Sequence, residues 1–469
     1  MKKITKTLLP LLFCICLLTA CVGTTPPDEI PEKPEQPTEI ETETAAPDPA
    51  DLYEPFVPVV RFAVVSDVHV HRAADNCAEA ERFRKLIELS YAYSHAHETY
   101  QTLDALVVAG DLTLGGTADE HRNFKSIITE CLTEETTLIP MLGNHEHYGN
   151  IKAYQSIVER ELNLHKVING FHFIAVSPDG NDYDDEDVNF LNTELAAAAQ
   201  DAPDKPIFAF QHHALKNTVY GSYDDDECGG GTDSTPGLRS AYDNYPQIFL
   251  FTGHTHVTMN HPRDIYQDNF TMLALGTLCN LECADRMTDG YIPSGSGTIG
   301  QFYIVEVNAD NVVKIMPYNI ITEDFMKTPS NTDDPDKQLV YYVKTPAGKE
   351  DFDYTAEKYN SSCFTAPHFT DDAAVTFSDI TATSAVASIP QALDDSCIYN
   401  YRLVYTGPDG SANEITFYSR FFEEPLCDTL SHILPDLTPD SDYTVSVYPI
   451  NAWKLEGEPI TGTFHTAAE

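Results

Sequence analysis

Five short clusters in this sequence combine aspartate, asparagine and histidine in patterns that suit metal binding. Taken singly, each cluster is a weak signal, because a lone Asp-x-His is more often a turn than a pair of ligands. Two histidines separated by one residue on a turn are more specific, since they can address two neighbouring metal ions. In chain order the clusters are Asp67-Val68-His69, Gly110-Asp111, Gly143-Asn144-His145-Glu146, Gln211-His212-His213 and Gly253-His254-Thr255-His256.

Each cluster directly follows a short apolar segment that is typical of a buried strand. These segments are residues 57–66, 103–109, 137–142, 206–210 and 248–251, with a further strand at 171–176. Helical patterns alternate with them at 78–100, 118–132, 187–200 and 234–245. Such alternation predicts an α/β domain with mainly parallel strands. Because ligands gather beyond the carboxyl ends of such strands, the five clusters are expected to meet there.

In this order, the motifs D-x-H, G-D, G-N-H-E, a single His after a strand and G-H-x-H resemble the calcineurin-like metallophosphoesterase superfamily. The resemblance covers about residues 56–320. It implies a four-layer αββα sandwich of two mixed sheets that hydrolyses phosphate esters through a metal-bridging hydroxide. It also implies a ligand set in two halves: Asp67, His69 and His256 for one ion, Asn144, His212 and His254 for the other, and Asp111 bridging both.

The residue types fit that implied chemistry. A shell of nitrogen and oxygen ligands without thiolates suits two ions of Fe, Mn, Zn or Co. Two such ions lower the pKa of a shared water and clamp the phosphate oxygens. By the same resemblance, His145 stabilises charge or donates a proton on the leaving-group side. Either His212 or His213 offers an imidazole, and the family pattern, which places the ligand first after the strand, favours His212.

Two departures narrow the resemblance. Purple acid phosphatases carry a tyrosine three residues after the bridging aspartate, whereas Leu114 stands there in this sequence. An iron–tyrosinate chromophore is therefore not expected. The stretch 110–116 (GDLTLGG) is closer to the bacterial phosphodiesterase-like branch, although the usual Asp after Thr113 is again Leu114. A small phosphodiester or nucleotide-like substrate is therefore favoured over a simple monoester.

Two insertions are candidates for substrate contact. Residues 215–237 are long and glycine-rich for a simple connection between strands. Residues 261–271 follow the last histidine cluster. Tyr220 and Arg263, one from each insertion, are the candidates for phosphate or nucleoside contact, with loop anchoring as an equally weighted alternative.

The charge balance excludes one class of function. The chain has 28 basic and 73 acidic residues, which gives a net charge of -45. Such a chain is not expected to bind nucleic acid through a basic face. It also suits small phosphorylated substrates better than long polyanions.

The N-terminus has the pattern of an exported lipoprotein. Three lysines precede an apolar segment at 8–18 that is too short to span a bilayer. The run Leu18-Thr19-Ala20-Cys21 resembles a bacterial lipobox, which implies cleavage before Cys21 and lipidation of its thiol. We therefore expect a signal peptide at 1–20 and a disordered Pro/Glu/Thr-rich tether at 21–55. The protein would then be exported and held at the cell envelope by its lipid alone.

The C-terminal part differs from the rest. Residues 322–365 are polar and irregular and predict a connector after a phosphoesterase domain at 56–321, whereas 366–469 contain short alternating strands. The run 434–447, with Tyr443 as its corner tyrosine, resembles the fibronectin type III pattern, which implies an Ig-like β-sandwich. The tryptophan usual early in that sandwich is missing.

The sandwich and the tether leave a second hypothesis open. The chain would then be a surface binding or adhesion lipoprotein that uses the phosphoesterase fold as a scaffold, with its C-terminal domain contacting a polymer or a protein. The completeness of the candidate ligand set favours the enzyme. Among the cysteines after Cys21, Cys397 with Cys427 is the one disulfide expected, and the lack of a C-x-x-C pair speaks against a zinc ribbon.

Overall fold

The computed structural model describes residues 52–469 except 225, 229, 233–234, 289, 329–336 and 346–347. The expected signal peptide, Cys21 and nearly all of the expected tether lie outside the described residues. The described residues belong to one compact unit, Pro49–Glu469. Within them, no helix combines the length and the apolar character that a membrane span requires.

The first sheet has the strand order β12-β11-β10-β1-β2-β3, and β13 also pairs with β11. Its parallel part consists of β1 (Pro58–Val65), β2 (Ala105–Ala109) and β3 (Thr137–Met141). Its antiparallel part consists of β10 (Gln301–Asn308), β11 (Val312–Asn319), β12 (Asp324–Phe325) and β13 (Tyr341–Lys344). The sheet is therefore mixed, with β1 at the junction of its two parts.

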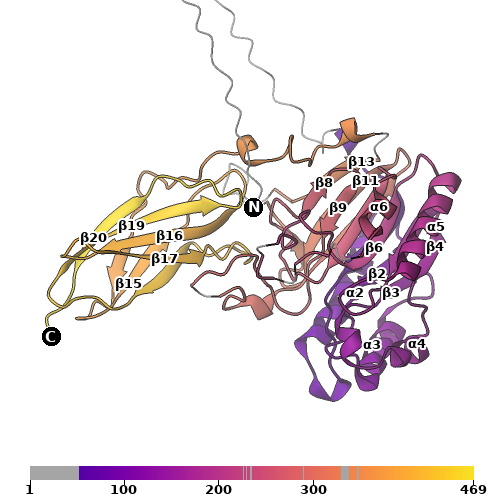
Figure 1. The fold of residues 1–469 in the computed structure, drawn as a ribbon, viewed down its shortest axis with the longest axis horizontal. Coiled ribbons are helices and arrows are strands. Elements are labelled where there is room, and N and C mark those ends of the chain that lie inside the picture. Colours follow the sequence, from indigo (N-terminus) through magenta and orange to yellow (C-terminus); the bar gives the residue numbers. More distant parts are fainter. Residues whose placement is uncertain are drawn as a thin grey trace, which may run out of the picture. The chain divides into compact units, whose positions relative to one another are not determined.

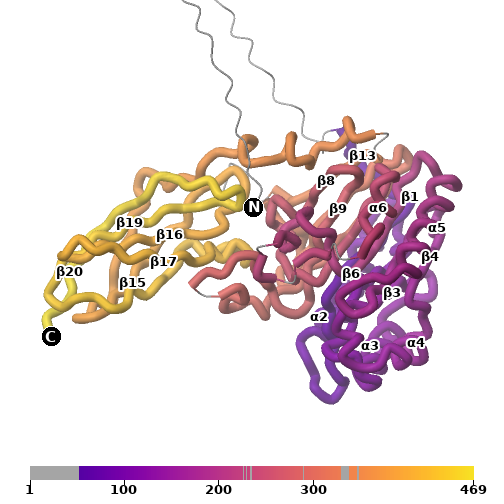
Figure 2. Tube along the Cα trace, in the orientation of Figure 1, coloured from indigo at the N-terminus to yellow at the C-terminus, as the bar shows by residue number. Residues whose placement is uncertain are grey.

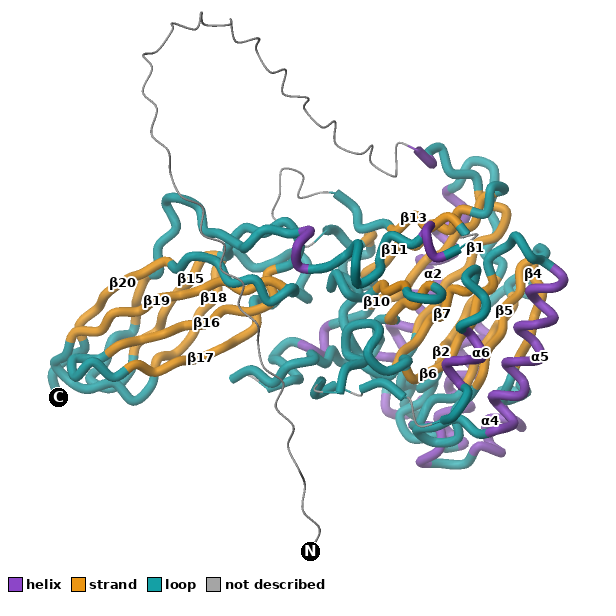
Figure 3. Tube along the Cα trace, turned by 45° about the horizontal axis from the view of Figure 1, so that its top comes forward, coloured by secondary structure: helices purple, strands orange, loops and turns teal. Residues whose placement is uncertain are grey.

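The second sheet has the order β4-β5-β6-β7-β9-β8. Four parallel strands form its centre: β5 (Phe171–Val176), β6 (Ile207–His213), β7 (Ile248–Gly253) and β9 (Thr271–Ala274). The edge strands β4 (Leu164–Ile168) and β8 (Ile265–Gln267) are antiparallel to their neighbours. Figures 1 and 3 show these strands beside the helices that cover the sheet.

Alternating side chains of β1 show how the layers stack. Phe62 belongs to the core between the two sheets, where its ring meets Phe173 and Phe208 at centroid distances of 5.0 and 4.8 Å. Ala63 and Val65 belong to a separate core formed with the helices on the outer face of the first sheet. Because successive strand residues point to opposite faces, β1 is buried on both sides. The four-layer αββα arrangement predicted from the sequence is confirmed.

Helices supply the outer layers. Those packed on the first sheet are α2 (Ala78–Ala96), α3 (Ala118–Cys131) and α4 (Ile151–Ile157). Those packed on the second sheet are α5 (Asp185–Asp201) and α6 (Leu238–Tyr242). Short 3₁₀ turns complete the described helical elements: η1 (Ala73–Asp75), η2 (His145–Tyr148), η3 (Ser296–Thr298), η4 (Lys349–Asp351) and η5 (Ser361–Cys363).

The C-terminal region forms two antiparallel sheets around its own core, drawn in orange to yellow in Figure 2. One sheet has the order β14-β15-β18, from β14 (Thr376–Ser378), β15 (Ala385–Pro390) and β18 (Thr429–Leu434). The other has the order β17-β16-β19-β20, from β16 (Ile398–Thr406), β17 (Ala412–Tyr418), β19 (Asp442–Asn451) and β20 (Ile460–His465). The alternating burial of β15 and β19 is that of strands with one face on a core.

Three segments differ from the sequence-based expectation. The segment 322–365 is not wholly irregular, since β12 and β13 extend the first sheet and the Tyr341 and Val343 side chains are buried in the core between the sheets. Residues 261–271 are not one free loop, because β8 lies within them. Strand β6 runs on to His213, so that His212 lies within the strand rather than after it.

The expected disulfide is wrong for this structure. Cys397 and Cys427 are both free thiols, as are the other cysteines of the described residues. The Cys397 Sγ lies 3.6 Å from the Ile398 carbonyl, and the Cys427 Sγ accepts a hydrogen bond from Gln391 at 3.7 Å. Each thiol therefore has a separate polar partner.

Candidate metal centre

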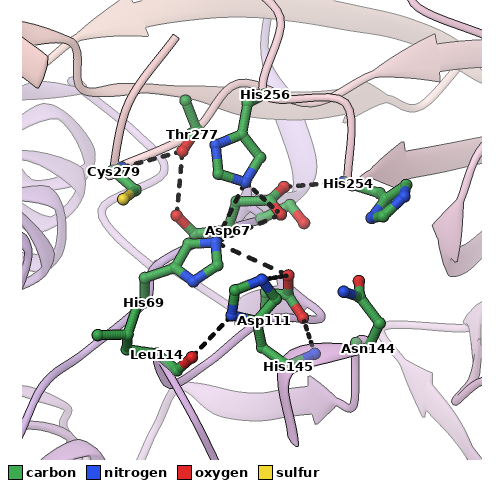
Figure 4. A network of polar contacts seen from close by, with 12 residues as sticks. Asp67, His69, Asp111, Leu114, Asn144, His145, His254, His256, Thr277 and Cys279 are labelled. Carbon is green, nitrogen blue, oxygen red and sulfur yellow. Dashed lines mark hydrogen bonds and ion pairs between the residues drawn. The ribbon is translucent and has the colours of Figure 1, made fainter. Parts of the chain in front are cut away.

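The carboxyl ends of five strands bring the predicted clusters together. Asp67 and His69 follow β1, Asp111 follows β2 and Asn144 follows β3. The second sheet contributes His212 from β6, and His254 and His256 from the end of β7. In Figure 4 the side chains of Asp67, His69, Asp111 and His256 gather at one point, while Asn144 and His254 lie to one side of them. The sequence-based expectation that the clusters meet at the strand ends agrees with this arrangement.

The backbone is strained where most of these residues lie. A non-glycine residue with positive φ is uncommon, and such residues cost of order 1–3 kcal/mol each. Between the strand ends, the Asp67 N–H donates to the Gly110 carbonyl at 3.2 Å and the His69 N–H to the Asp111 carbonyl at 2.9 Å. These bonds hold the strained loops together. The residues with positive φ are Asp67 (53°), His69 (48°), Asp111 (49°), His254 (72°) and His256 (49°).

The glycines of three ligand clusters, Gly110, Gly143 and Gly253, clear space for a ligand from another strand. A Cβ on Gly110 would overlap the His212 ring, and a Cβ on Gly253 would lie 2.7 Å from Asp67 Oδ2. A Cβ on Gly143 would overlap Asp111 Oδ1 and lie 2.7 Å from His212 Nε2. The glycines of the motifs are thus required by side-chain packing at the centre.

One group of ligand atoms is formed by Asp67, His69, Asp111 and His256, all buried and all within 4.8 Å of one another. The Nε2 atoms of His69 and His256 lie only 3.1 Å apart, and His256 Nε2 lies 3.2 Å from Asp67 Oδ1. Asp67 Oδ1 is buried and accepts no hydrogen bond from a described residue. Two imidazole nitrogens and an unsatisfied carboxylate oxygen directed at one point fit a bound cation.

The second group contains His212, His213 and His254. The His212 Nδ1 donates to the Ala109 carbonyl at 2.9 Å, which leaves Nε2 as the metal-binding nitrogen. That Nε2 lies 3.1 Å from Asn144 Oδ1 and 3.4 Å from Asp111 Oδ2.

His213 differs from His212 in its contacts. Neither ring nitrogen of His213 has a hydrogen-bond partner among the described residues, and its ring lies 4.3 Å from that of His254. Only His212 reaches both Asn144 and Asp111. The geometry therefore favours His212 as the partner of those two residues, as the sequence pattern does.

The charges of the centre balance only with added positive charge. Burial by itself raises the pKa of the Asp67 and Asp111 carboxyls, but neighbouring imidazoles outweigh it and hold both pKa values below their usual range. Burial would lower the pKa of His212 and His256, yet the same carboxylates raise each pKa to about 9. Protons on these two imidazoles thus take the place of a cation, and a bound metal ion would displace them.

The remaining two histidines stay neutral. Burial, with His256 nearby, lowers the pKa of His69 to about 3. Burial, with His212 nearby, lowers the pKa of His254 to about 4. Neutral imidazole is the form that coordinates a metal ion, so both rings are ready for that role.

His145 is placed at the rim of the centre. Its side chain is 26% exposed, whereas those of Asp67, His69 and Asp111 are almost completely buried. The His145 Nδ1 donates to the Leu114 carbonyl at 2.7 Å, and its backbone N–H donates to Asp111 Oδ1 at 2.9 Å. The free Nε2, 3.8 Å from Asp111 Oδ2, is available to a bound substrate (Figure 4).

Glu146 is a supporting residue for which the sequence analysis predicted no role. Its fully buried carboxyl group accepts hydrogen bonds from the Gly143 N–H at 2.8 Å and from the N–H and hydroxyl of Thr113, both at 2.9 Å. Burial, with Asp111 nearby, raises the pKa of Glu146 to about 8. The side chain ties the loop after β2 to the loop after β3. The position of Glu146 in the G-N-H-E motif was the sequence feature from which its role could have been predicted.

Other supporting contacts had no signal in the sequence. The Asn144 Nδ2 donates to the Tyr148 hydroxyl at 3.3 Å, which turns Oδ1 toward His212. The segment after β9 closes over the other side, where Thr277 donates its hydroxyl to the Asp67 carbonyl at 3.1 Å. The Asn280 carbonyl accepts from His256 Nδ1 at 2.8 Å. These contacts orient the candidate ligands.

The two predicted substrate residues do not contact the candidate ligands. Tyr220 is 1% exposed, stacks on His261 at 3.8 Å and shares a hydrogen bond with the Tyr399 hydroxyl at 2.8 Å. Its role as a substrate contact is not supported, because its ring is buried and its hydroxyl is occupied, as loop anchoring requires. Arg263 lines a cavity whose walls contain none of the candidate ligands.

Comparisons with known proteins match part of this chain to a protein family. Residues 60–258 match the model of the Calcineurin-like phosphoesterase family. Among curated proteins, none matches the chain. Purple acid phosphatase PPD1 from yellow lupin (Lupinus luteus) seeds is 15% identical, with 63% of this chain and 56% of that chain covered and a TM-score of 0.42. The third fibronectin III domain of human KIAA0343 protein is 20% identical, with 22% and 86% covered and a TM-score of 0.18.

These structural likenesses are too low to carry an argument about function, which rests instead on the family match and on the buried Asp/His cluster. The two mixed sheets and the cluster at their strand ends define a metal-dependent phosphoesterase. More particularly, residues 60–258 match the Calcineurin-like phosphoesterase family.

Gly143→Ala tests the packing of the centre. Because the added methyl group would overlap Asp111 Oδ1, we expect metal content to fall and phosphoesterase activity to drop by roughly 100-fold, as for lost supporting contacts at metal sites. Metal analysis and steady-state kinetics give the readout. Gly297→Ala is the matched control, because a Cβ there meets nothing within 4 Å. Equal metal content in the two variants would contradict the prediction.

Proposed function

We propose that the centre holds two metal ions and hydrolyses phosphate esters. In this assignment Asp67, His69 and His256 would hold one ion, Asn144, His212 and His254 would hold the other, and Asp111 would bridge them. The observation that carries the proposal is the position of Asp111. Its Oδ2 lies 3.7 Å from His69 Nε2 in one group and 3.4 Å from His212 Nε2 in the other. Bound Fe, Mn, Zn or Co ions would activate water as the nucleophile and offset the charge of the phosphate.

His145 would act on the leaving group. Because a carbonyl oxygen only accepts, Leu114 holds the proton of His145 on Nδ1 and fixes the direction of Nε2. The imidazolium form then presents an Nε2–H to the oxygen that leaves phosphorus. Its partial exposure at the rim, beside the bridging carboxylate, suits a group that meets substrate rather than metal.

The favoured substrate is a small phosphodiester or nucleotide-like molecule rather than a simple monoester. The stretch 110–116 supports this choice by its resemblance to the phosphodiesterase-like branch. The net charge of -45 supports a small substrate, because an acidic surface repels long polyanions. The alternative, a binding or adhesion lipoprotein with a scaffold domain, is weaker because the candidate ligand set is complete.

Asp111→Asn tests the proposed function. Loss of one bridging oxygen charge should reduce bound metal and lower hydrolysis of bis-p-nitrophenyl phosphate by roughly 1,000-fold, a loss of about 4 kcal/mol of transition-state stabilisation. Asp119→Asn is the matched control, since the Asp119 side chain is 62% exposed on α3. If wild type supplied with Mn²⁺ hydrolysed no faster than Asp111→Asn, the proposal would fail. The ratio of the wild-type rates on bis-p-nitrophenyl phosphate and on p-nitrophenyl phosphate measures the preference for a diester over a monoester.

His145→Ala separates leaving-group chemistry from metal binding. We expect kcat to fall by roughly 10²–10⁴-fold while metal content stays unchanged, because the side chain is not a ligand. The loss should be smaller for nitrophenyl esters than for alkyl esters, whose leaving oxygens need a proton more. His147→Ala, from the same turn, is the control, since His147 bonds to the Pro178 carbonyl instead. A loss of metal on mutating His145 would contradict this role.

We also propose that the protein is exported and anchored by lipid on Cys21. The basic residues, the apolar segment and the Leu-Thr-Ala-Cys run in the sequence support this proposal. Cys21→Ala should move the protein from the membrane fraction to the soluble fraction and abolish labelling by radioactive palmitate. Cys77→Ala is the control. Equal palmitate labelling of the two variants would refute the assignment.

The C-terminal region, we propose, is a fibronectin type III-like domain. Its three-stranded and four-stranded antiparallel sheets support this, as does Tyr443, whose hydroxyl accepts the Thr438 N–H at 2.8 Å in the manner of a corner tyrosine. Tyr399, Tyr418 and Phe421 from this region lie in the same buried cluster as residues of the second sheet. That end of the domain therefore packs in the same core as the phosphoesterase domain, and polymer or protein contact would fall to its remaining surface.

A further inference from the structure

A cavity of about 220 Å³ lies apart from the metal centre, and none of its lining residues is a candidate ligand. Four segments form it: the insertion 215–237, the chain around β8, the segment after β13 and the turn after β19. Its walls are mainly aromatic and cationic. They include Tyr223, Arg263, Tyr266, Tyr359, Trp453 and Lys454.

The charge of this cavity is opposite to that of the chain. The protein has 73 acidic and 28 basic residues, yet the cavity is lined by Arg263 and Lys454 and by no aspartate or glutamate. Neither of the two cationic side chains forms an ion pair or a side-chain hydrogen bond with any residue that the structure describes, and the Arg263 Nε is buried without a partner there. Buried Arg61, in contrast, pairs with Glu306 at 2.6 Å. An unpaired guanidinium in such an acidic chain points to an anionic ligand.

Aromatic rings hold the donors of the cavity in place. The Arg263 guanidinium lies 4.6 Å from the ring centroid of Tyr223 and 5.8 Å from that of Tyr220, both within cation–π range. Trp453 stacks on Phe364 at 5.2 Å and meets Tyr359 edge-on at 5.3 Å. A site held in this way loses little freedom when a ligand binds.

Two buried N–H groups of the lining residues have no acceptor. They are the Nε of Arg263 and the Nε1 of Trp453, which make no hydrogen bond to any described residue. Because buried donors are normally paired, these two groups favour a ligand that brings acceptor oxygens. The aromatic walls favour a ring against them, and the volume, below the roughly 300–1,000 Å³ of sites for drug-sized ligands, admits only one ring unit.

We infer that this cavity binds an acidic monosaccharide unit, free or at the end of a glycan. Its carboxylate or phosphate meets Arg263 and Lys454, and its ring lies against the aromatic side chains. The site is separate from the phosphoesterase centre and does not depend on the function proposed for that centre. It gives the chain a second, non-catalytic binding function.

Trp453 makes the inference directly testable, because it is the one tryptophan of the chain and it lines the cavity. Titration of the metal-loaded protein with glucuronate should change tryptophan fluorescence in a saturable way. Glucose and inorganic phosphate, which each supply only half of the proposed ligand, should bind at least 10-fold more weakly. Glucose 1-phosphate in the Asp111→Asn variant tests the phosphate-bearing form of the sugar.

Variants of the lining residues locate glucuronate binding within this cavity. Arg263→Ala should weaken glucuronate binding by at least 10-fold, and Lys454→Gln should weaken it less, with melting temperatures close to wild type. Arg122→Ala is the matched control, since the Arg122 side chain is 60% exposed on α3. Asp111→Asn should bind glucuronate as wild type does.

The inference is overturned by any of four results. The first is no saturable fluorescence change with both glucuronate and glucose 1-phosphate, and the second is glucose binding as tight as glucuronate binding. The third is unchanged glucuronate binding in Arg263→Ala, and the fourth is loss of glucuronate binding in Asp111→Asn. Inorganic phosphate binding as tightly as the acidic sugars would overturn the sugar assignment, because the ring would then contribute nothing.

Discussion

The rest of this structure depends on the need of two buried carboxylates, Asp67 and Asp111, for compensating positive charge. Each lies within 4 Å of imidazole nitrogens, and no lysine or arginine is paired with either among the described residues. A buried carboxylate needs a compensating cation or hydrogen bonds, and here a metal ion is the counterpart that the surrounding ligands are arranged to hold. The left-handed backbone at five candidate ligands and the glycines before three clusters follow from bringing so many short side chains to one point.

The need for compensating positive charge beside these carboxylates also explains why two sheets contribute to the centre. The carboxylates come from the first sheet, after β1 and β2, whereas the imidazoles of His212, His254 and His256 come from the second. The spacing of the two halves therefore depends on the core between the sheets. Phe62 packs there against Phe173, Phe208, Phe210 and Phe251, with ring centroids 4.8 to 6.3 Å apart. Protein cores resist changes of volume, so this aromatic packing keeps the two halves of the centre at a constant separation.

Much of the fold and of the centre could be predicted from the sequence, because the strands that carry ligands are buried on both faces and appear as continuous apolar runs. The strands β4 and β8 were missed, since short edge strands are partly exposed and lack such runs. β13 was missed because its residues, Tyr341 to Lys344, lie in a polar setting and are recruited by the free edge of β11. Glu146 and Tyr148 were not given roles, because their partners are backbone groups and amides that only the folded loops bring near. The cation-lined cavity has no local signal at all, since four distant segments form it.

The bond from His145 to the carbonyl of Leu114 has a consequence for the evolution of this site. Leu114 positions His145 through a main-chain carbonyl, which every residue type has. This contact therefore does not require a particular side chain at position 114. Leu114 is indeed 39% exposed. Position 114 can therefore change residue type without displacing the rim histidine. Substitutions at position 114 would then alter the exposed surface beside the rim histidine without moving the carbonyl that positions it.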